Sequence, residues 1–376
     1  QILYLPFRLI YSGVKPIIAF AEKTEVSARI LDFFSSDDRK RAAYPTYYSR
    51  TGGGIKFYQK DLVTPGSKLS MTATIGLHWQ QLYKVQFRQL DLGKNFTAGF
   101  TAQYRFLSDG NFFGLGNDSL IADESNFALK QTSFVAGLGM DLSEKAYLGT
   151  TFTLDLNEIS KGRDQRTPST TWLPIEHQRL LPGLNEPIDL WNLNLQFQYN
   201  SPNRLGNPSA GWELFLNSGL SRQINGNKFG FIKTAVDITR YIHLFYDRTL
   251  VVRLAAESTR PFSNTRIPFY YLSQLGPHGT IRGFHRGRFR DRDMTLFSLE
   301  YRYPLIKRPG DKVNIDAMLF VDWGKVSHNL FQSHLLKDYH RGIGLGIRIF
   351  SLKGVIMKLY FGKSKGDYRI YLSLNE

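Results

Sequence analysis

The sequence has 376 residues, of which 42% are hydrophobic and 14% aromatic, carries a formal net charge of +16 and contains no Cys. Its mean hydropathy is −0.28 and no run approaches the 18 or so apolar residues of a membrane-spanning helix, which excludes a helical membrane protein, while the lack of Cys excludes a disulfide scaffold and a Cys nucleophile. A transmembrane β-barrel is not excluded, because its strands alternate lipid-facing with interior residues and so combine low mean hydropathy with many aromatic side chains.

Residues 1–41 differ in pattern from the rest of the chain. Apolar side chains recur there at mostly helical spacing, interrupted by Gly13 and Pro16, until a Ser-Ser-Asp-Asp cluster at 35–38. This predicts a short amphipathic helical segment, and two roles stay open for it: packing over one end of a barrel, or acting as a membrane-surface anchor or an interior plug. No signal peptide is visible ahead of it, so we expect either that the numbering begins at the mature protein or that the signal was left out of this sequence.

From residue 42 to residue 376 the hydrophobic period is two. Leu148, Phe152 and Leu154, for example, alternate with Thr151 and Thr153. We therefore predict an all-β fold, a 16-stranded antiparallel transmembrane β-barrel. The expected strands are 42–49, 53–62, 67–80, 82–91, 95–107, 128–142, 145–158, 190–201, 210–224, 228–241, 247–259, 294–306, 312–326, 339–351, 354–363 and 367–376.

The connections between these strands are unequal in length. Most long ones fall on one end of the predicted barrel and short turns on the other, the asymmetry expected between extracellular loops and periplasmic turns. The long connections are 108–127, 158–189, 260–293 and 327–338.

The seam between the first and last strands should be weak. Pro45 donates no ladder hydrogen bond, and the glycine run at 52–54 lowers local strand stability. We expect the wall to open there, and a crosslink between residues near Tyr47 and near Tyr371 to impair function.

Two short motifs lie about 40 residues apart on predicted neighbouring strands. The first motif is Ile281, Arg282, Gly283 and Phe284; Glu300 begins a Glu-Tyr-Arg-Tyr-Pro-Leu strand after it; the second motif is Phe320, Asp322 and Gly324. This order resembles the BamA/TamA superfamily, the Omp-eighty-five or bacterial surface antigen barrels, in which the first motif is at the tip of a loop folded back into the barrel. The resemblance covers roughly residues 42 to 376.

The chemistry of the two motifs can be argued from their residues. Asp322 should point inward, because the opposite face of its strand carries apolar side chains: Ile315, Leu319 and Val321. A loop that folds inward leaves Arg282 with little water, and a guanidinium there needs a bidentate carboxylate. The resemblance names Asp322 as that partner, and Gly283 permits a tight backbone path.

Four arginines at alternate positions follow the first motif. They line the interior or form an anion site on the outer face, and the sequence leaves both interpretations open. These residues are Arg286, Arg288, Arg290 and Arg292.

The resemblance implies a location in the outer membrane of a Gram-negative-type bacterium and a role in inserting or translocating protein or lipid. The 40 residues before the barrel are too few for a POTRA domain, so a POTRA-less member is expected. Expected partners are outer-membrane lipid, lipopolysaccharide and protein partners of an envelope complex. Basic residues do not cluster on a helix, so no nucleic-acid partner is predicted.

Two alternatives from other functional classes stay open: an accessory or scaffold subunit of a larger envelope complex, and a passive pore. An enzyme is not expected, since no Gly-x-Ser-x-Gly or Walker motif is present, and no cofactor or metal is expected. His328, His334 and His340 are six residues apart, which matches no common zinc motif.

Overall fold

The computed structural model describes residues 36, 38, 40–48, 50–203, 207–276, 280–306, 314–330, 332, 337–351 and 354–374. The helical segment predicted within 1–41 lies almost wholly outside these ranges.

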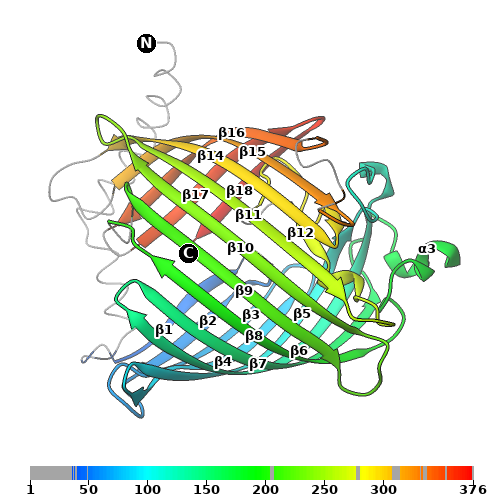
Figure 1. The fold of residues 1–376 in the computed structure, drawn as a ribbon, viewed down its shortest axis with the longest axis horizontal. Coiled ribbons are helices and arrows are strands. Elements are labelled where there is room, and N and C mark those ends of the chain that lie inside the picture. Colours follow the sequence, from blue (N-terminus) through cyan, green and yellow to red (C-terminus); the bar gives the residue numbers. More distant parts are fainter. Residues whose placement is uncertain are drawn as a thin grey trace.

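Sixteen strands form one antiparallel sheet in which each strand pairs with its neighbours along the chain (Figure 1). The first eight are β1 (Arg41–Tyr48), β2 (Gly52–Lys60), β3 (Lys68–Ile75), β4 (Gln81–Gly93), β5 (Phe96–Phe112), β6 (Ser125–Ser143), β7 (Ala146–Lys161) and β8 (Ile188–Asn200). The other eight are β9 (Gly211–Gln223), β10 (Gly230–His243), β11 (Thr249–Pro261), β14 (Asp293–Ile306), β15 (Asn314–Ser327), β16 (His340–Ser351), β17 (Gly354–Ser364) and β18 (Asp367–Leu374).

The predicted number and order of these strands are confirmed. Among the larger departures are β5 and β6, which are longer than expected because their pairing continues past a register shift between Leu107 and Gly110. A bulge of this kind adds a residue to one strand without ending the ladder.

The distribution of side chains is the reverse of that in a soluble protein. In β3, Ser70, Thr72 and Thr74 are buried, whereas Met71 and Ile75 are 45% and 50% exposed. Polar side chains that line the inner face and apolar ones that point outward suit a sheet with hydrocarbon around it.

One residue of β15 departs from the predicted outward pattern. Leu319 is 43% exposed, as expected of a lipid-facing side chain, but Ile315 is only 4% exposed. Ile315 lies next to a β14–β15 register shift between Pro304 and Ile306, but its pairing with Ile349 of β16 is regular.

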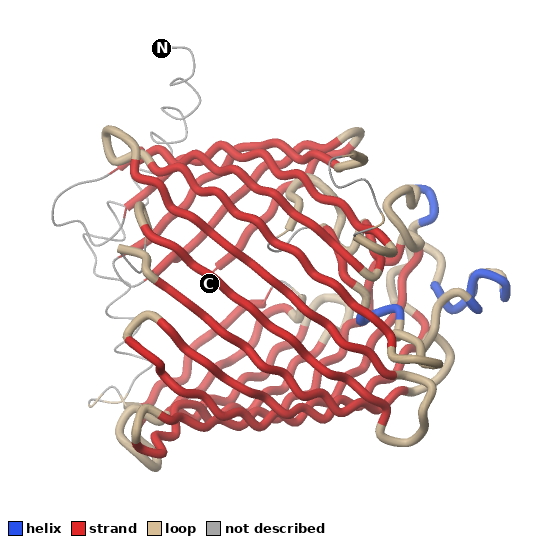
Figure 2. The backbone as a smooth tube through the Cα atoms, viewed as in Figure 1, coloured by secondary structure: helices blue, strands red, loops and turns tan. Residues whose placement is uncertain are grey.

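The sheet curls round into a cylinder, as the tube in Figure 2 shows, but it is not closed. Within the described residues β1 pairs only with β2 and β18 only with β17, so the predicted closure into a barrel is absent here. Both edge strands are eight residues long, and Pro45 removes a donor from β1, so a closing ladder would be short.

The longer connections gather at one end of the sheet, as predicted, near α3 in Figure 1. They carry η2 (Ile121–Asp123), η3 (Thr170–Trp172), α3 (Ile175–Arg179) and η4 (Phe269–Tyr271). The connection between β11 and β14 also contains a small hairpin that the sequence did not predict, β12 (Ser273–Leu275) and β13 (Phe289–Asp291). In the described part of the chain no helix is long and apolar enough to span a membrane.

Candidate functional site: an inward loop bound to the sheet

The connection between β11 and β14 folds into the interior of the curled sheet. Its apolar side chains pack with residues of β11, β14 and β15, and this burial holds the loop against the inner face. The buried cluster consists of Ala255, Leu275, Ile281, Phe284, Phe289, Met294, Leu296 and Val326.

Arg282, at the tip of this loop, makes the contact predicted from its motif. Its Nε and Nη2 donate to the two carboxylate oxygens of Asp322, each at 2.8 Å, and its main-chain N–H donates to Asp322 at 2.9 Å. Nη1 donates to Glu300 at 2.7 Å, and Nη2 also reaches the hydroxyl of Ser298 at 3.2 Å. One guanidinium therefore joins the loop to β14 and β15 at once.

These charges are largely removed from water. The side chains of Arg282, Glu300 and Asp322 are 14%, 11% and 0% exposed. The Phe320 ring centroid lies 3.6 Å from Cζ of Arg282, close enough for a cation–π contact. Burial opposes the charge of Arg282, but Asp322 and then Glu300 outweigh it and raise its pKa above the usual value, so Arg282 is charged at every physiological pH.

A line of charges continues from Glu300 along the inner face, and the sequence analysis missed it. Arg302 donates to Glu300 at 2.8 Å, and Arg348 lies 3.9 Å from Asp316. Asn207, from the connection between β8 and β9, bridges these last two at 2.9 and 2.8 Å. A second connection thus reaches inward, from the end opposite the long loops.

The loop is also attached to the last strand. The hydroxyl of Tyr371 in β18 donates to the Phe284 carbonyl at 2.8 Å and accepts from the Gly283 N–H at 3.2 Å. His285 lies 3.0 Å from Asp367, also in β18. Tyr371, which the sequence analysis assigned to the seam, therefore directs its side chain to the inward loop.

The other two seam residues lie far from this contact in the sheet order. Pro45 and Tyr47 belong to β1, the opposite edge of the sheet, where Pro45 faces Ile55 across the β1–β2 ladder. Tyr47 is 54% exposed. Within the described residues no strand pairing joins this edge to β18.

Glycines make the close approach of the loop to the sheet sterically feasible. Gly283 has a φ of 97°, and a Cβ there would lie 2.9 Å from the Lys363 carbonyl carbon. A Cβ on Gly342 of β16 would lie 1.8 Å from the Arg282 carbonyl oxygen, and one on Gly324 would lie 3.0 Å from Leu275. The role of Gly342 was not recognised from the sequence.

The alternating arginines after the motif are interior residues. Arg288 and Arg290 are 7% and 3% exposed, and Arg288 donates to the hydroxyl of Ser119 at 2.8 Å. An anion site on the outer face is therefore wrong for these two residues, because the loop carries them inside the sheet.

The described residues contain no group of three His, Asp or Glu side chains placed to hold a metal ion. His328 lies 3.6 Å from Asp291, and His340 stacks on Phe289 with ring centroids 3.8 Å apart. His334 lies outside the described residues.

Comparison with known families and structures agrees with this geometry. Residues 64–354 match the model of the Omp85 superfamily domain. No curated protein sequence matches the chain.

Several solved structures share the fold. BamA from Haemophilus ducreyi lacking POTRA domains 1–3 matches with a TM-score of 0.60 at 18% identity, over 88% of this chain and 67% of that one. CdiB from Acinetobacter baumannii gives 0.51 at 15%, over 87% and 57%, and CdiB from Escherichia coli gives 0.52 at 12%, over 89% and 60%. The chain thus spans between 57% and 67% of the length of these three proteins.

Proposed function

Because this chain belongs to the Omp85 superfamily of Gram-negative outer-membrane proteins, we propose that it inserts or translocates protein or lipid at that membrane, through the wall between β1 and β18. In this proposal the sixteen-stranded sheet is a transmembrane β-barrel whose exposed apolar face contacts lipid. The net charge of +16 suits the anionic lipopolysaccharide of that membrane as a further partner.

The observation that carries this proposal is that, among the described residues, β1 and β18 each pair with a strand on one side only. A strand edge in hydrocarbon has N–H and C=O groups that water cannot satisfy, so it requires a partner strand or a polar environment. An edge that lacks a ladder to its neighbour can take up a strand of another protein, or admit a polar lipid head group, at little cost in existing hydrogen bonds.

The inward loop gives this opening a means of control. It is bound to β14 and β15 through Arg282 and to β18 through Tyr371, so it fixes the last strand relative to the body of the sheet. A loop and a charge network inside the sheet also disfavour the passive-pore alternative, which requires a clear interior. Steady conductance of the purified protein in planar bilayers would support the pore instead.

A crosslink across the opening tests the proposal. Cys residues replace Tyr47 in β1 and Ile370 in β18, a neighbour of Tyr371 that is 71% exposed, so the contact between Tyr371 and the loop is kept. After reaction with a bismaleimide, the protein in liposomes should no longer catalyse insertion of a urea-unfolded outer-membrane protein. Full activity of the crosslinked protein would reject a moving wall.

A control crosslink joins strands that are already paired. Leu216 in β9 faces Val236 in β10, so Leu216→Cys with Val236→Cys adds the same reagent without restraining the edges. This variant should insert the client protein at the rate of the unmodified protein.

A further inference from the structure

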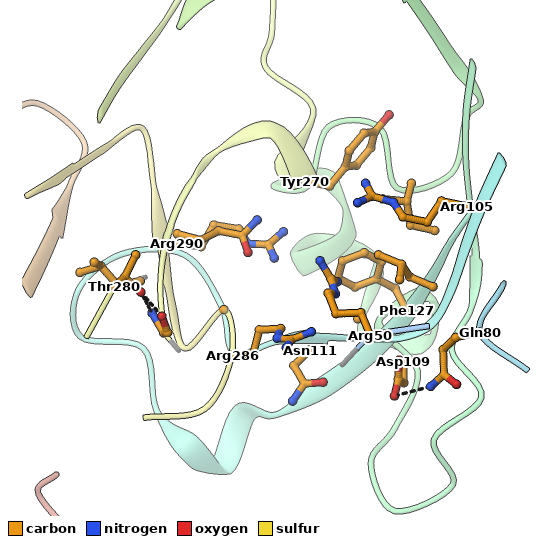
Figure 3. A pocket seen from close by; sticks show the side chains of 17 residues that line it. Arg50, Gln80, Arg105, Asp109, Asn111, Phe127, Tyr270, Thr280, Arg286 and Arg290 are labelled. Atoms are coloured by element: carbon orange, nitrogen blue, oxygen red, sulfur yellow. Dashed lines mark hydrogen bonds between the residues drawn. The ribbon is translucent and has the colours of Figure 1, made fainter. Parts of the chain in front are cut away.

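A cavity of about 490 Å³ lies between the inward loop and the end of β5 that is nearest the long connections (Figure 3). Guanidiniums from separate parts of the chain line it, and Figure 3 shows those of Arg50, Arg105 and Arg290 turned toward the same space. Arg50 follows β1, Arg105 belongs to β5, and Arg286 and Arg290 belong to the loop.

The charges around this cavity are not balanced. Asp109 is the carboxylate among the described lining residues, and it already accepts a hydrogen bond from Gln80 at 2.9 Å and lies 3.6 Å from His78. Arg50 is repelled by the three other guanidiniums and attracted by Asp109. Arg105 is also attracted by Asp155. Among the described residues Arg50, Arg105 and Arg290 still outnumber Asp109 and Asp155, an excess of positive charge that an anion would relieve.

Arg290 shows that the excess is built into the packed interior. Its side chain is buried, and its Nη1 donates to the Phe269 carbonyl at 3.2 Å. Its Nε has no hydrogen-bond partner among the described residues, and neither has that of Arg105, whose Nη2 donates to neutral Gln131. Burying donors that have no acceptor is unfavourable, most of all for Arg290, which has no carboxylate hydrogen-bond partner among the described residues, so these donors are expected to serve a ligand.

The rings near Arg290 do not replace an anion. Phe269, Phe112 and Phe127 have centroids 5.4 to 5.7 Å from its Cζ, within cation–π range. Such contacts favour a cation, but aromatic rings supply no acceptors for the N–H groups that point outward in the plane of the guanidinium.

We propose that this cavity binds the phosphate group of a phosphate ester. A tetrahedral phosphate offers several oxygens in different directions and up to two negative charges, so guanidiniums from opposite walls can bind it together. A carboxylate is planar and singly charged, so it offers less charge and fewer acceptor directions to guanidiniums on opposite walls.

The volume is larger than a phosphate group needs. At about 30 Å³ per molecule, roughly sixteen waters would fill it. The group to which the phosphate is esterified can therefore enter as well. The phosphate can come from a lipid head group or from a soluble ester, and the experiment separates these sources.

Inorganic pyrophosphate, a compact anion with two phosphate groups, is titrated into the full chain by calorimetry at low salt, where screening is weak. We expect saturable binding that is at least tenfold tighter than that of citrate, a carboxylate of similar charge. No binding at millimolar pyrophosphate, or equal affinity for citrate, would overturn the assignment of phosphate.

Variants then locate the site. Arg290→Gln and Arg50→Gln should each weaken pyrophosphate binding at least tenfold. Arg222→Gln, which removes an exposed arginine of β9 that does not line the cavity, should leave the affinity unchanged. Arg50 lies in a turn, so Arg50→Gln tests the site even where Arg290→Gln fails to fold. Unchanged affinity in folded Arg50→Gln and Arg290→Gln proteins would place binding elsewhere.

The lipid source is tested in phosphatidylcholine nanodiscs with and without lipopolysaccharide. A tenfold loss of pyrophosphate affinity when lipopolysaccharide is present identifies a lipid phosphate as the occupant, whereas an unchanged affinity identifies a soluble ester. The measurement involves no client protein, so its outcome is independent of the proposed insertion activity.

Discussion

Removal of either partner of the Arg282–Asp322 pair should loosen the tip of the inward loop without unfolding the sheet. Asp322 is fully buried, and in Arg282→Ala the donors left to it among the described residues are the Ser298 hydroxyl and the main-chain N–H of residue 282. Stranding a buried charge in this way costs about 3–5 kcal/mol. In Asp322→Ala, Arg282 retains Glu300, so we expect the cost to be at the lower end of that range.

The apolar contacts of the loop set the extent of the change. Leu275, Ile281, Phe284 and Phe289 are all buried, and burial of each such side chain contributes about 1.5–3 kcal/mol. Together they exceed the loss of the ion pair. The loop is therefore expected to stay inside, with local opening near residues 280–287 increased by roughly two to three and a half orders of magnitude, since each 1.4 kcal/mol corresponds to a factor of ten.

Hydrogen exchange measured by mass spectrometry reports this opening directly, and chymotryptic cleavage at Phe284 provides a second readout. The double variant should resemble the more strongly affected single variant, because the two residues act as one unit. Lys130→Ala is the control, since Lys130 donates to Glu158 across β6 and β7, which are several strands away from β14 and β15 in the sheet order. Strictly additive losses, or unchanged exchange in all three loop variants, would refute the reasoning.

Three further changes address the same loop. Tyr371→Phe removes the hydroxyl that binds two main-chain groups of the loop, and should raise exchange at residues 283–284 by about fivefold to tenfold, as expected for roughly 1–1.5 kcal/mol; exchange equal to that of the unaltered protein would mean that the hydroxyl contributes nothing. Gly342→Ala places a Cβ against the Arg282 carbonyl and should displace the loop tip, which should speed chymotryptic cleavage of the loop. An unchanged cleavage rate would show that the loop does not approach β16 closely. Burial, and then Arg369, lower the pKa of His285 below its usual 6.5, so the docked loop favours the neutral ring and is destabilised as the pH falls below 6.5. Amide hydrogen exchange of the loop, relative to intrinsic rates, should therefore be faster at pH 5 than at pH 7.5. His285→Asn should abolish this difference.

The strands were predictable because two different solvents act on the two faces of the sheet. Each strand must present apolar side chains to one side and small or polar ones to the other, and this constraint operates within the strand itself. Ser70, Thr72 and Met71 show it within three residues. Strand ends were less predictable, since β5 and β6 extend past a bulge that has no signal in the alternation.

The contacts of the site were predictable only where a motif carried them. Arg282 and Asp322 were identified through a family resemblance, and nothing in local periodicity would have paired them. Gly283 and Tyr371 are 88 residues apart and lie on a loop and an edge strand, so their contact depends on how far the sheet curls. The hairpin of β12 and β13 was missed because three residues per strand are too few to establish a period.

The interior charges divide into two groups with different consequences. Around the loop tip, Arg282, Arg302 and Arg348 are matched by Asp322, Glu300 and Asp316, so that group can hold connections in place without any ligand. Around the cavity, Arg50, Arg105 and Arg290 outnumber Asp109 and Asp155 among the described residues. The loop contributes Arg282 to the first group and Arg286 and Arg290 to the second. Occupation of the cavity by an anion would therefore stabilise the docked position that Arg282 also favours, by an amount that depends on ligand concentration. Pyrophosphate should therefore slow amide hydrogen exchange at residues 280–290 in the unaltered protein and have no effect in Arg50→Gln. Equal protection in both proteins would show that binding in the cavity does not stabilise the docked loop.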